Sequence, residues 1–223
     1  MKRKLILIVL FGLVPFLTIF AQTDQGKVLL GISTRYSISP YEIGISSADI
    51  MTIGFSTIKF KSDASSEDES ESLKFNCINL IPKVGYFVIN NLALGLDVNI
   101  GMSSIKETYD EGESKSTSSV LTAGPFVRYY FPLGKAFPFI EAGASLGSMK
   151  SKYEYDSETD EYVSSLNSIT GGVGIAALLN DKVSFDFLVG YLSTTLKDKE
   201  DNPNNERMVI GTLGFKFGVV LFL

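Results

Sequence analysis

Large apolar residues alternate with small or polar residues along most of the chain after residue 27. Between residues 92 and 102, Leu, Val, Ile and Met occupy every second position, and Ala, Gly, Asp and Asn fill the positions between them. Residues 183–187 and 209–223 repeat the pattern. A period of two predicts β-strands whose two faces meet different surroundings.

The composition of the two faces decides between classes of β-protein. A soluble sandwich or lipocalin-like barrel turns its apolar face inward and covers its outer face with charged side chains. Here the face opposite the large apolar residues carries mostly Gly, Ala, Ser, Thr and Asn. Large apolar residues outside and small or polar ones inside describe a barrel in lipid. We therefore expect Leu94, Leu96, Phe185 and Phe187 to face lipid, with a soluble secreted β-sandwich as the alternative.

The connections between the alternating segments are of two kinds that follow each other in turn. Most of the chain's 25 Asp and Glu residues fall in the long kind. The short connections are 88–91, 132–136 and 179–182, and the long acidic ones are 61–72, 106–115, 150–161 and 197–206. Seven connections join eight strands. The sequence predicts an all-β fold, an eight-stranded antiparallel up-and-down transmembrane β-barrel with short periplasmic turns and long acidic extracellular loops.

Two segments compete for the first membrane pass. Residues 27–36 and 49–60 both have the composition of strands, but the alternation of connections leaves room for one pass before residue 61. Counting both would put the two termini on opposite sides of the membrane. We expect one pass, with the other segment extending it or folding into the first loop, and a ten-stranded barrel as the alternative.

The first 21 residues have the form of a secretory signal peptide. Met1-Lys2-Arg3-Lys4 is followed by an uncharged apolar stretch over 5–20, and polar residues begin after Ala21. This stretch is shorter than the roughly 20 residues that a membrane-spanning helix needs. We predict cleavage after Ala21, which leaves 22–223 as the barrel domain. The signal peptide exports the chain, and we expect the barrel in the outer membrane.

Composition excludes several kinds of chemistry. The chain has no His and a single Cys, so it has no disulfide framework, no multi-cysteine metal site and no mechanism that depends on a catalytic His. A net charge of −5 disfavours nucleic acid as a partner. No twelve-residue calcium loop is present in the acidic segments. We expect no cofactor and no metal, and we interpret Cys77 as a packed thiol on a strand near the loop rim.

Six charged residues lie on the small-residue face of the strands, which places them in the lumen. They carry three charges of each sign: Lys83, Asp97, Arg128, Glu141, Asp186 and Lys216. Lys83 and Asp97 flank one short turn, and Arg128 and Glu141 flank the next, each pair close to direct cross-strand register. These pairs predict a plug of salt bridges, because an eight-stranded barrel is only wide enough for its own side chains. A charged constriction that tunes solute passage is the alternative.

Aromatic residues and prolines recur beside the short turns. Outward-facing Tyr86, Tyr129 and Phe131 are predicted to form an aromatic girdle at the membrane boundary, and Phe87 and Tyr130 face inward. Pro82 and Pro125 occupy matching positions in two repeats. Because proline has no N–H to donate to a sheet, we predict a bulge at each.

The C-terminal residues have the pattern polar-x-Gly-x-x-apolar-x-apolar, in which x is any residue. Lys216, Gly218, Leu221 and Leu223 supply it. This pattern resembles the signal by which the outer-membrane assembly machinery recognises barrels, although the last residue is Leu rather than an aromatic residue. A final amphipathic strand with no signalling role is the alternative.

Three segments near the short turns have a characteristic sequence: Pro82-Lys83-Val84-Gly85-Tyr86-Phe87-Val88, Asn90-Asn91-Leu92-Ala93-Leu94-Gly95-Leu96 and Arg128-Tyr129-Tyr130-Phe131-Pro132. Through them the chain resembles the small outer-membrane β-barrel, or porin-family, proteins of Bacteroidota, and the resemblance covers the whole of 22–223. It implies an outer-membrane barrel and leaves activity open, because most members have no assigned ligand.

These observations favour a non-enzymatic integral outer-membrane protein. It would have a structural or interaction role in the cell envelope through its acidic loops, with a lumen closed by charged pairs. The alternative is a narrow porin-like channel for ions or very small solutes. An outer-membrane lipid-modifying enzyme or protease is disfavoured, because the known barrel enzymes of that kind use a catalytic His and this chain has none. The expected partners are outer-membrane lipid, the barrel assembly machinery and an unidentified ligand of the loops.

Overall fold

The structure is a computed structural model that describes residues 21–34, 53–59, 72–109, 112–155, 158–199, 202, 204 and 206–223. Most of the predicted signal peptide and of the predicted loop 61–72 lies outside these residues. Among the residues that the structure describes, no helix has the length and apolar character needed to span a membrane. The elements are η1 (Ala21–Thr23), β1 (Val28–Ser33), β2 (Ile53–Lys59), β3 (Ser72–Ile89), β4 (Leu92–Tyr109), β5 (Gly112–Tyr130), β6 (Ala136–Tyr155), β7 (Glu158–Leu178), β8 (Val183–Asp198) and β9 (Met208–Phe222).

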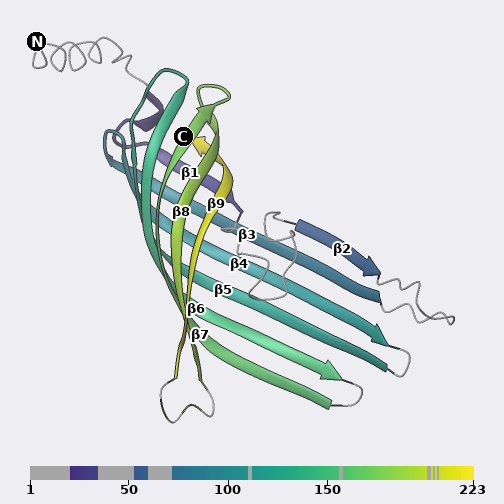
Figure 1. The fold of residues 1–223 in the computed structure, drawn as a ribbon. Helices are drawn as coiled ribbons and strands as arrows, with labels where there is room; N and C mark the ends of the chain where they lie inside the picture. The colour runs from purple at the N-terminus through teal and green to yellow at the C-terminus, as the bar shows by residue number, and fades with distance from the viewer. Residues whose placement is uncertain are drawn as a thin grey trace, which may run out of the picture.

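Eight of the nine strands form a closed ring. From β3 to β9 each strand pairs antiparallel with the next one in the sequence, and β1 closes the ring by pairing with both β9 and β3. The ribbon in Figure 1 shows these strands running up and down around one axis, with both the C-terminus and β1 at the end where the short turns lie. The prediction of an eight-stranded up-and-down barrel is confirmed.

The first pass of the barrel is divided between two strands. β1 pairs with Ile81 to Tyr86 of β3, and β2 pairs with Ser72 to Ile78 of the same strand. The two strands therefore lie one after the other along one edge of β3. Both competing segments contribute to a single pass, as expected, and the ten-stranded alternative is wrong.

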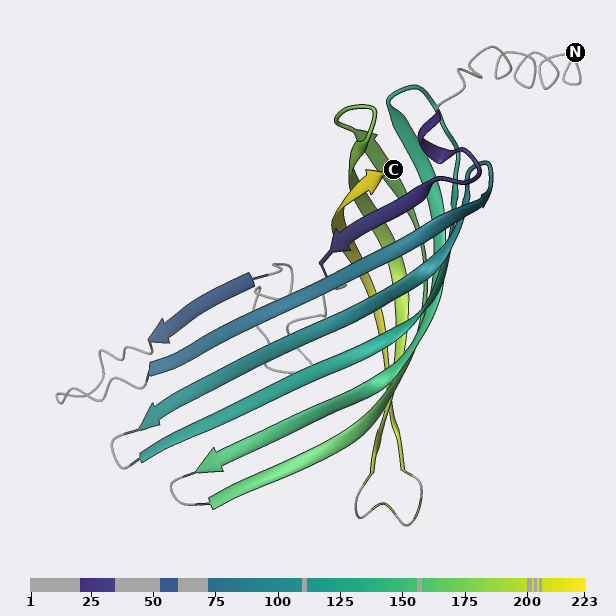
Figure 2. The same ribbon diagram turned by 180° about the vertical axis from the view of Figure 1, so that it is seen from behind.

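The ring is closed more completely at one end than at the other. We call the end with the three short connections the turn end and the opposite end the hairpin end. At the turn end β1 pairs with residues 218–222 of β9, whereas residues 208–216 have β8 as their only strand partner in the described part of the chain. Figure 2 shows the same contrast, with strands gathered at the turn end and spread apart at the hairpin end.

The N-terminal segment packs over the turn end. Thr23 of η1 is completely buried, and its hydroxyl donates a hydrogen bond of 2.6 Å to the side-chain oxygen of Asn91. The Asn91 N–H donates to the Thr23 carbonyl at 2.7 Å. Asn91 has a φ of 69°, a left-handed conformation that Asn tolerates in a two-residue hairpin turn. Reciprocal backbone hydrogen bonds between Val28 and Leu223 then join the two ends of the described barrel.

The strands are longer than a membrane requires. β3 to β9 contain 15 to 21 residues, whereas about 9–11 residues cross the hydrocarbon core. Two of the predicted long loops, 106–115 and 150–161, belong mostly to the ends of paired strands. Within them, 110–111 and 156–157 lie outside the described residues. Their acidic composition suggested loops, but cross-strand partners let the sheet continue.

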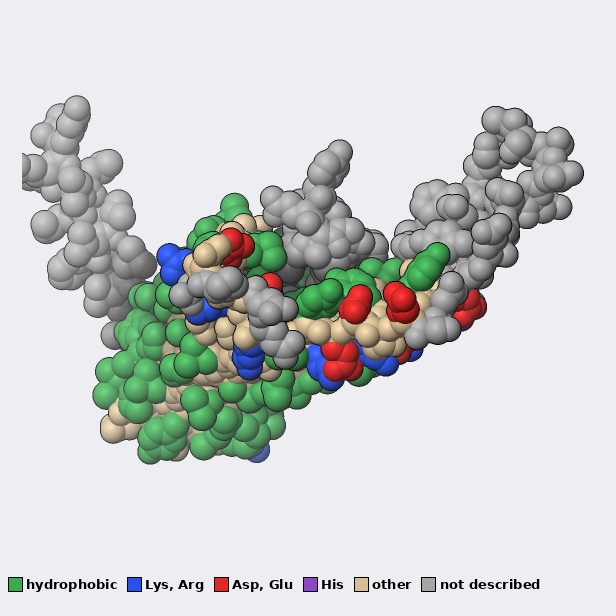
Figure 3. All heavy atoms as spheres, turned by 90° about the horizontal axis from the view of Figure 1, so that it is seen from below, with side chains coloured by type: hydrophobic (Ala, Val, Ile, Leu, Met, Phe, Trp, Pro, Cys, Tyr) green, Lys and Arg blue, Asp and Glu red, His purple; other side chains and the backbone are tan. Residues whose placement is uncertain are grey.

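The outer face of the barrel carries the large apolar side chains. Leu94, Leu96 and Phe185 are 45%, 57% and 43% exposed, and Phe187 is half-buried on the same face. Figure 3 shows hydrophobic side chains forming a broad surface, with acidic and basic side chains beside each other toward the ends of the strands. The predicted orientation is confirmed, and the soluble sandwich, which would bury these residues, is not what forms.

The two prolines do not introduce bulges. Pairing of β3 with β4 lapses around Pro82 and pairing of β5 with β6 lapses around Pro125, but the pairing offset is the same on both sides of each gap. The register shift between β3 and β4 lies at Phe87 and Ile89, next to the turn. The prediction of bulges is wrong because a missing N–H removes one ladder hydrogen bond, while the long ladders on either side keep the register.

Candidate functional site

Charged side chains meet inside the barrel next to the turn end. Five strands each contribute one of them, and all five are at least 94% buried: Lys83 from β3, Arg128 from β5, Glu141 from β6, Asp186 from β8 and Lys216 from β9. We call this set the charged layer. Alternation along the strands directs these residues inward, and the ring then brings them together although they are far apart in the sequence.

Glu141 is the centre of the charged layer. One of its carboxylate oxygens, Oε2, accepts hydrogen bonds from Lys83 Nζ at 2.8 Å and from Arg128 Nε at 2.7 Å. The other, Oε1, accepts from Lys216 Nζ at 3.1 Å. One carboxylate therefore holds three cations from three other strands, which ties β3, β5 and β9 to β6.

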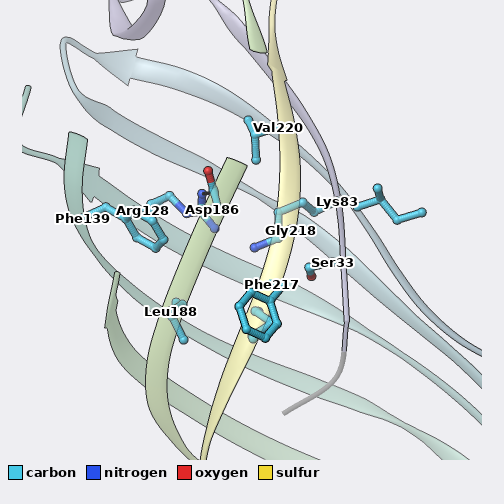
Figure 4. Close-up of a pocket in the computed structure, with 11 residues that line it drawn as sticks. Ser33, Lys83, Arg128, Phe139, Asp186, Leu188, Phe217, Gly218 and Val220 are labelled. Carbon is cyan, nitrogen blue, oxygen red and sulfur yellow. Dashed lines mark hydrogen bonds and ion pairs between the residues drawn. The ribbon is translucent and has the colours of Figure 1, made fainter. Parts of the chain in front are cut away.

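Arg128 connects Glu141 to the second buried carboxylate. It forms an ion pair with Asp186 and donates a hydrogen bond of 2.9 Å to the hydroxyl of Tyr130. Ser184 donates to the other oxygen of Asp186 at 2.7 Å. In Figure 4 Arg128 and Asp186 approach each other from opposite strands, beside the ring of Phe139. The guanidinium carbon lies 4.1 Å from the centre of that ring, within range of a cation–π interaction.

The predicted cross-strand registers are found, but they do not fix all the ion pairs. Arg128 lies directly opposite Glu141 and binds it. Lys83 lies directly opposite Asp97, yet its ammonium group binds Glu141, and Asp97 is half-buried at the edge of the layer. The expected partner of Lys83 therefore changes, because a long side chain in a narrow lumen reaches across the barrel as easily as along its wall.

An aromatic layer lies between the charged layer and the turn end. Its central ring is Tyr130, whose centroid lies 5.6 Å from that of Phe139 and 5.9 Å from those of Phe87 and Phe222. Phe137 packs edge-on against Tyr130 at 6.3 Å. All five rings are buried. Geometries of this kind favour tight aromatic packing, and the layer fills the lumen at this level.

Lumenal glycines make room for the rings. A Cβ atom at Gly174 would lie 2.4 Å from an edge carbon of Phe139, and one at Gly95 would lie 2.7 Å from an edge carbon of Phe126. Backbone carbonyl oxygens would be equally close, that of Phe187 at 2.5 Å from a Cβ atom at Gly174 and that of Val84 at 2.1 Å from one at Gly95. Real Cβ atoms do not approach so closely, so each glycine is required both by an aromatic ring on one neighbouring strand and by the backbone of the other. Sequence reasoning assigned Phe87 and Tyr130 to the interior but left Phe137, Phe139 and Phe222 unassigned. Matching lumenal glycines with aromatic residues on adjacent strands would have found some of them.

The space that remains beside the charged layer is small. The cavity there has a volume of about 10 Å³ and is lined by residues that include Lys83, Arg128, Asp186, Lys216 and Gly218 (Figure 4). A cavity of this size holds about one water molecule. Within the described residues, no group of three or more Cys, Asp or Glu side chains is arranged to hold a metal ion.

The other residues singled out by the sequence lie where their strand positions put them. Tyr86 and Phe131 are about half-exposed on the outer face, and Tyr129 packs edge-on against Phe131 at 4.8 Å between ring centroids. Leu223 is exposed at the end of the barrel. Cys77 belongs to β3, but its side chain lies outside the described residues. The membrane-boundary role of the three aromatics stays a prediction, as does recognition of Lys216, Gly218, Leu221 and Leu223 by the assembly machinery.

A second set of charges lies on the outer face of the strand ends. Lys106 pairs with Glu113 at 2.8 Å, Lys150 with Glu161 at 2.8 Å, Lys115 with Glu154 at 3.5 Å, and Lys152 also pairs with Glu154. A hydrogen bond from Lys152, followed by the charge of Lys115, holds the pKa of the exposed Glu154 carboxyl below its usual range. A hydrogen bond from Lys150 does the same to the pKa of Glu161.

An exposed apolar outer face around a ring of eight antiparallel strands defines a membrane-spanning β-barrel. In the described residues, charged side chains lie in the lumen, in the turns and at the strand ends. Residues 47–219 match the family described as "Outer membrane protein beta-barrel domain". The match covers most of the chain, and the protein belongs to this family of the bacterial outer membrane. No curated relative matches the chain.

Several solved outer-membrane proteins are similar to the chain. The Neisserial surface protein NspA is 15% identical, with a TM-score of 0.35 over 87% of this chain and 95% of its own. OprG from Pseudomonas aeruginosa is 11% identical, with a TM-score of 0.39 over 91% and 98%. The outer-membrane protease OmpT from Escherichia coli is 9% identical, with a TM-score of 0.35 over 89% and 91%. These loose superpositions carry no functional conclusion.

Proposed function

We propose that the protein is a non-enzymatic outer-membrane barrel with a closed lumen, which serves the cell envelope as a structural element and presents its strand ends to partners. The proposal rests on one observation: two layers of side chains, one charged and one aromatic, fill the lumen. Charged and aromatic layers follow one another along the axis, and the cavity beside the charged layer has a volume of about 10 Å³. A hydrated ion does not pass through such a space.

The charged layer resists opening. Each of its ion pairs is almost fully withdrawn from water, with Lys83 and Glu141 side chains 1% and 4% exposed. Removing one partner of a buried pair costs about 3–5 kcal/mol, because the other charge is left uncompensated. A channel would have to separate several such pairs at once, so the layer favours a plug over a gate.

The same burial argues against catalysis in the lumen. The buried carboxylates of Glu141 and Asp186 are neutralised by Arg128 and two lysines and have no substrate-sized space beside them. The chain has no His that could act as a general base.

Features of the hairpin end support a role in interaction. The strands continue well beyond the apolar band, and they enclose on their inner side a hollow of about 550 Å³, lined in part by Tyr153, Tyr162, Met208, Asp198 and Glu206. Tyr153 and Tyr162 are about half-exposed and pack edge-on at 6.1 Å. A concavity with both apolar and charged walls is of the size that proteins use for ligands. We place the interaction surface here, and we include outer-membrane lipid and the assembly machinery among the partners.

Conductance in planar bilayers tests the proposal. The purified barrel should fold, as judged by a gel mobility that changes on boiling, and should then produce no unit conductance steps. Stable steps would support the second candidate, a narrow channel. The variant Lys216→Gln keeps the size of the side chain but removes one lumenal charge, so a true channel would change its ion selectivity. Steps that are identical in the two proteins would indicate leakage around the barrel, and the closed lumen would stand.

A further inference from the structure

Lysine is the first outward-facing charged residue beyond the apolar band on several strands. Outward positions follow from alternation with the buried residues of the charged layer. On β4 the first such residue is Lys106, on β5 it is Lys115, on β6 it is Lys150 and on β8 it is Lys197. On β7 the corresponding residue is Glu161. On each of these four strands the first outward charge is thus positive, although the chain as a whole is acidic.

The lysines stand at the depth of lipid headgroups. The last exposed apolar residues before them are Met102 on β4, Leu121 on β5, Leu146 on β6 and Tyr191 on β8. Only Ser and Thr face outward in between. The separation of four to six residues corresponds to about 13–20 Å along the strand, or about 10–15 Å along the membrane normal at the usual tilt. A lysine stem of about 6 Å can return its ammonium group to the headgroup layer.

Two of these lysines face each other across the sheet. Lys106 of β4 lies directly opposite Lys115 of β5 on the outer face. Like charges in direct cross-strand register repel each other and destabilise the pair. On the next strand Lys150 and Lys152 lie two residues apart on the same face. We call Lys106, Lys115, Lys150 and Lys152 the lysine belt.

Among the described side chains, four ammonium groups share three carboxylates. The ion-pair partners of the lysine belt there are Glu113, Glu154 and Glu161. On β5 and β6 the carboxylate lies farther from the apolar band than the lysine does, since Glu113 follows Lys115 and Glu154 follows Lys152 in that direction. Each ammonium group has three N–H donors, so it can bind a carboxylate and a further anion at the same time.

We propose that the lysine belt binds phosphorylated headgroups of the membrane leaflet at the hairpin end. A phosphate between Lys106 and Lys115 would relieve their repulsion while remaining attached to an acyl chain on the apolar band below. The proposal needs the barrel to be inserted in a membrane, but it does not depend on a closed lumen. It gives the hairpin end an anchor that differs in chemistry from the aromatic residues at the turn end.

Reconstitution in vesicles of two compositions tests the lysine belt. The full chain is folded into phosphatidylcholine alone and into phosphatidylcholine with one-fifth phosphorylated lipid A, and the midpoint of thermal unfolding is followed by the change in gel mobility. We expect lipid A to raise the midpoint of the wild type by at least about 4 °C, since basic residues near an anionic surface each contribute to binding. The quadruple variant K106Q/K115Q/K150Q/K152Q should show a rise of less than about 1 °C.

The matched control removes the carboxylates instead. Glu113→Gln, Glu154→Gln and Glu161→Gln together break the same ion pairs but keep all four lysines. If the lysines bind lipid phosphate, this variant keeps the shift caused by lipid A. If the lysines only pair with carboxylates, both variants lose the same stability in both kinds of vesicle, and the proposal is wrong. The proposal is equally wrong if the wild type shows no shift.

A further arm separates lipid phosphate from free phosphate. Inorganic phosphate is added to the wild type in phosphatidylcholine vesicles, at a concentration equal to that of the lipid A phosphate in the mixed vesicles. No shift supports lipid headgroups as the ligand. A shift equal to that caused by lipid A would overturn the assignment to lipid.

Discussion

The two ends of this barrel are built from the same strands but are organised in different ways. At the turn end the lumen contains stacked rings and a network of ion pairs centred on Glu141, and β1 joins the first and last parts of the ring. At the hairpin end residues 208–216 of β9 pair only with β8 in the described part of the chain, and the ion pairs lie half-exposed on the outer face. The turn end therefore stabilises the fold, and the hairpin end is the half that is accessible to partners.

Burial explains why similar residue types act differently at the two ends. Lys83 and Glu141 make an ion pair from which water is excluded, so loss of either leaves a charge that nothing else solvates. Lys150 and Glu161 are about half-exposed, and water replaces either partner when it is lost. The same pair of side-chain types is therefore structural at the turn end and replaceable at the hairpin end.

The largest effect should come from removing the carboxylate at the centre of the charged layer. Glu141→Ala leaves Lys83, Arg128 and Lys216 with one fewer buried anion, and we expect a loss of about 3–5 kcal/mol in the free energy of unfolding. Urea titration of the barrel in vesicles measures it. Glu161→Ala, which breaks an exposed pair, is the control and should change stability far less. Equal losses in the two variants would contradict the contrast between the ends.

A smaller effect is expected from filling the space that a lumenal glycine provides. Gly174→Val would push a side chain into the ring of Phe139, and overpacking of this kind costs about 1–3 kcal/mol. Combining it with Phe139→Leu, which shortens the opposing side chain, should recover part of the loss. The double-mutant cycle measures the coupling. Strictly additive losses would show that the ring and the glycine do not share this space.

The smallest effect concerns the pH dependence of the exposed pairs. The pKa of Glu154 lies below its usual range because of the hydrogen bond from Lys152. A carboxyl group of this kind contributes stability above its ordinary pKa and loses that contribution as the pH falls through its lowered value. The difference in stability between the wild type and Glu154→Gln should thus be small at neutral pH and vanish in acid. A difference that grows in acid would contradict the assigned ion pair.

Period-two alternation and the spacing of connections were sufficient to predict the ring of strands, because both depend on local sequence. They also located the five residues of the charged layer, since alternation alone decides which side chains face inward. The partner of Lys83 could not be predicted, because contacts across the lumen depend on how the closed ring staggers its strands. Phe137, Phe139 and Phe222 were not recognised as lumenal for a related reason. Aromatic residues near a short turn suit either the membrane boundary or the interior, and only the three-dimensional ring separates the two.

The ends of several strands were predicted as loops, because their acidic and polar composition is typical of loops and their pairing is not visible in the sequence. Residues 150–161 are acidic and polar, which is typical of loops, yet Lys150 pairs with Glu161 on the neighbouring strand, and the backbones of the two strands stay paired to their ends. Such pairing depends on register, which the sequence does not specify in a polar segment.

The division of the first pass gives its two strands unequal importance. β1 and β2 follow each other along one edge of β3, but within the described residues β1 alone also pairs with β9. Circular closure of the wall therefore depends on the six residues of β1, whereas β2 only lengthens it.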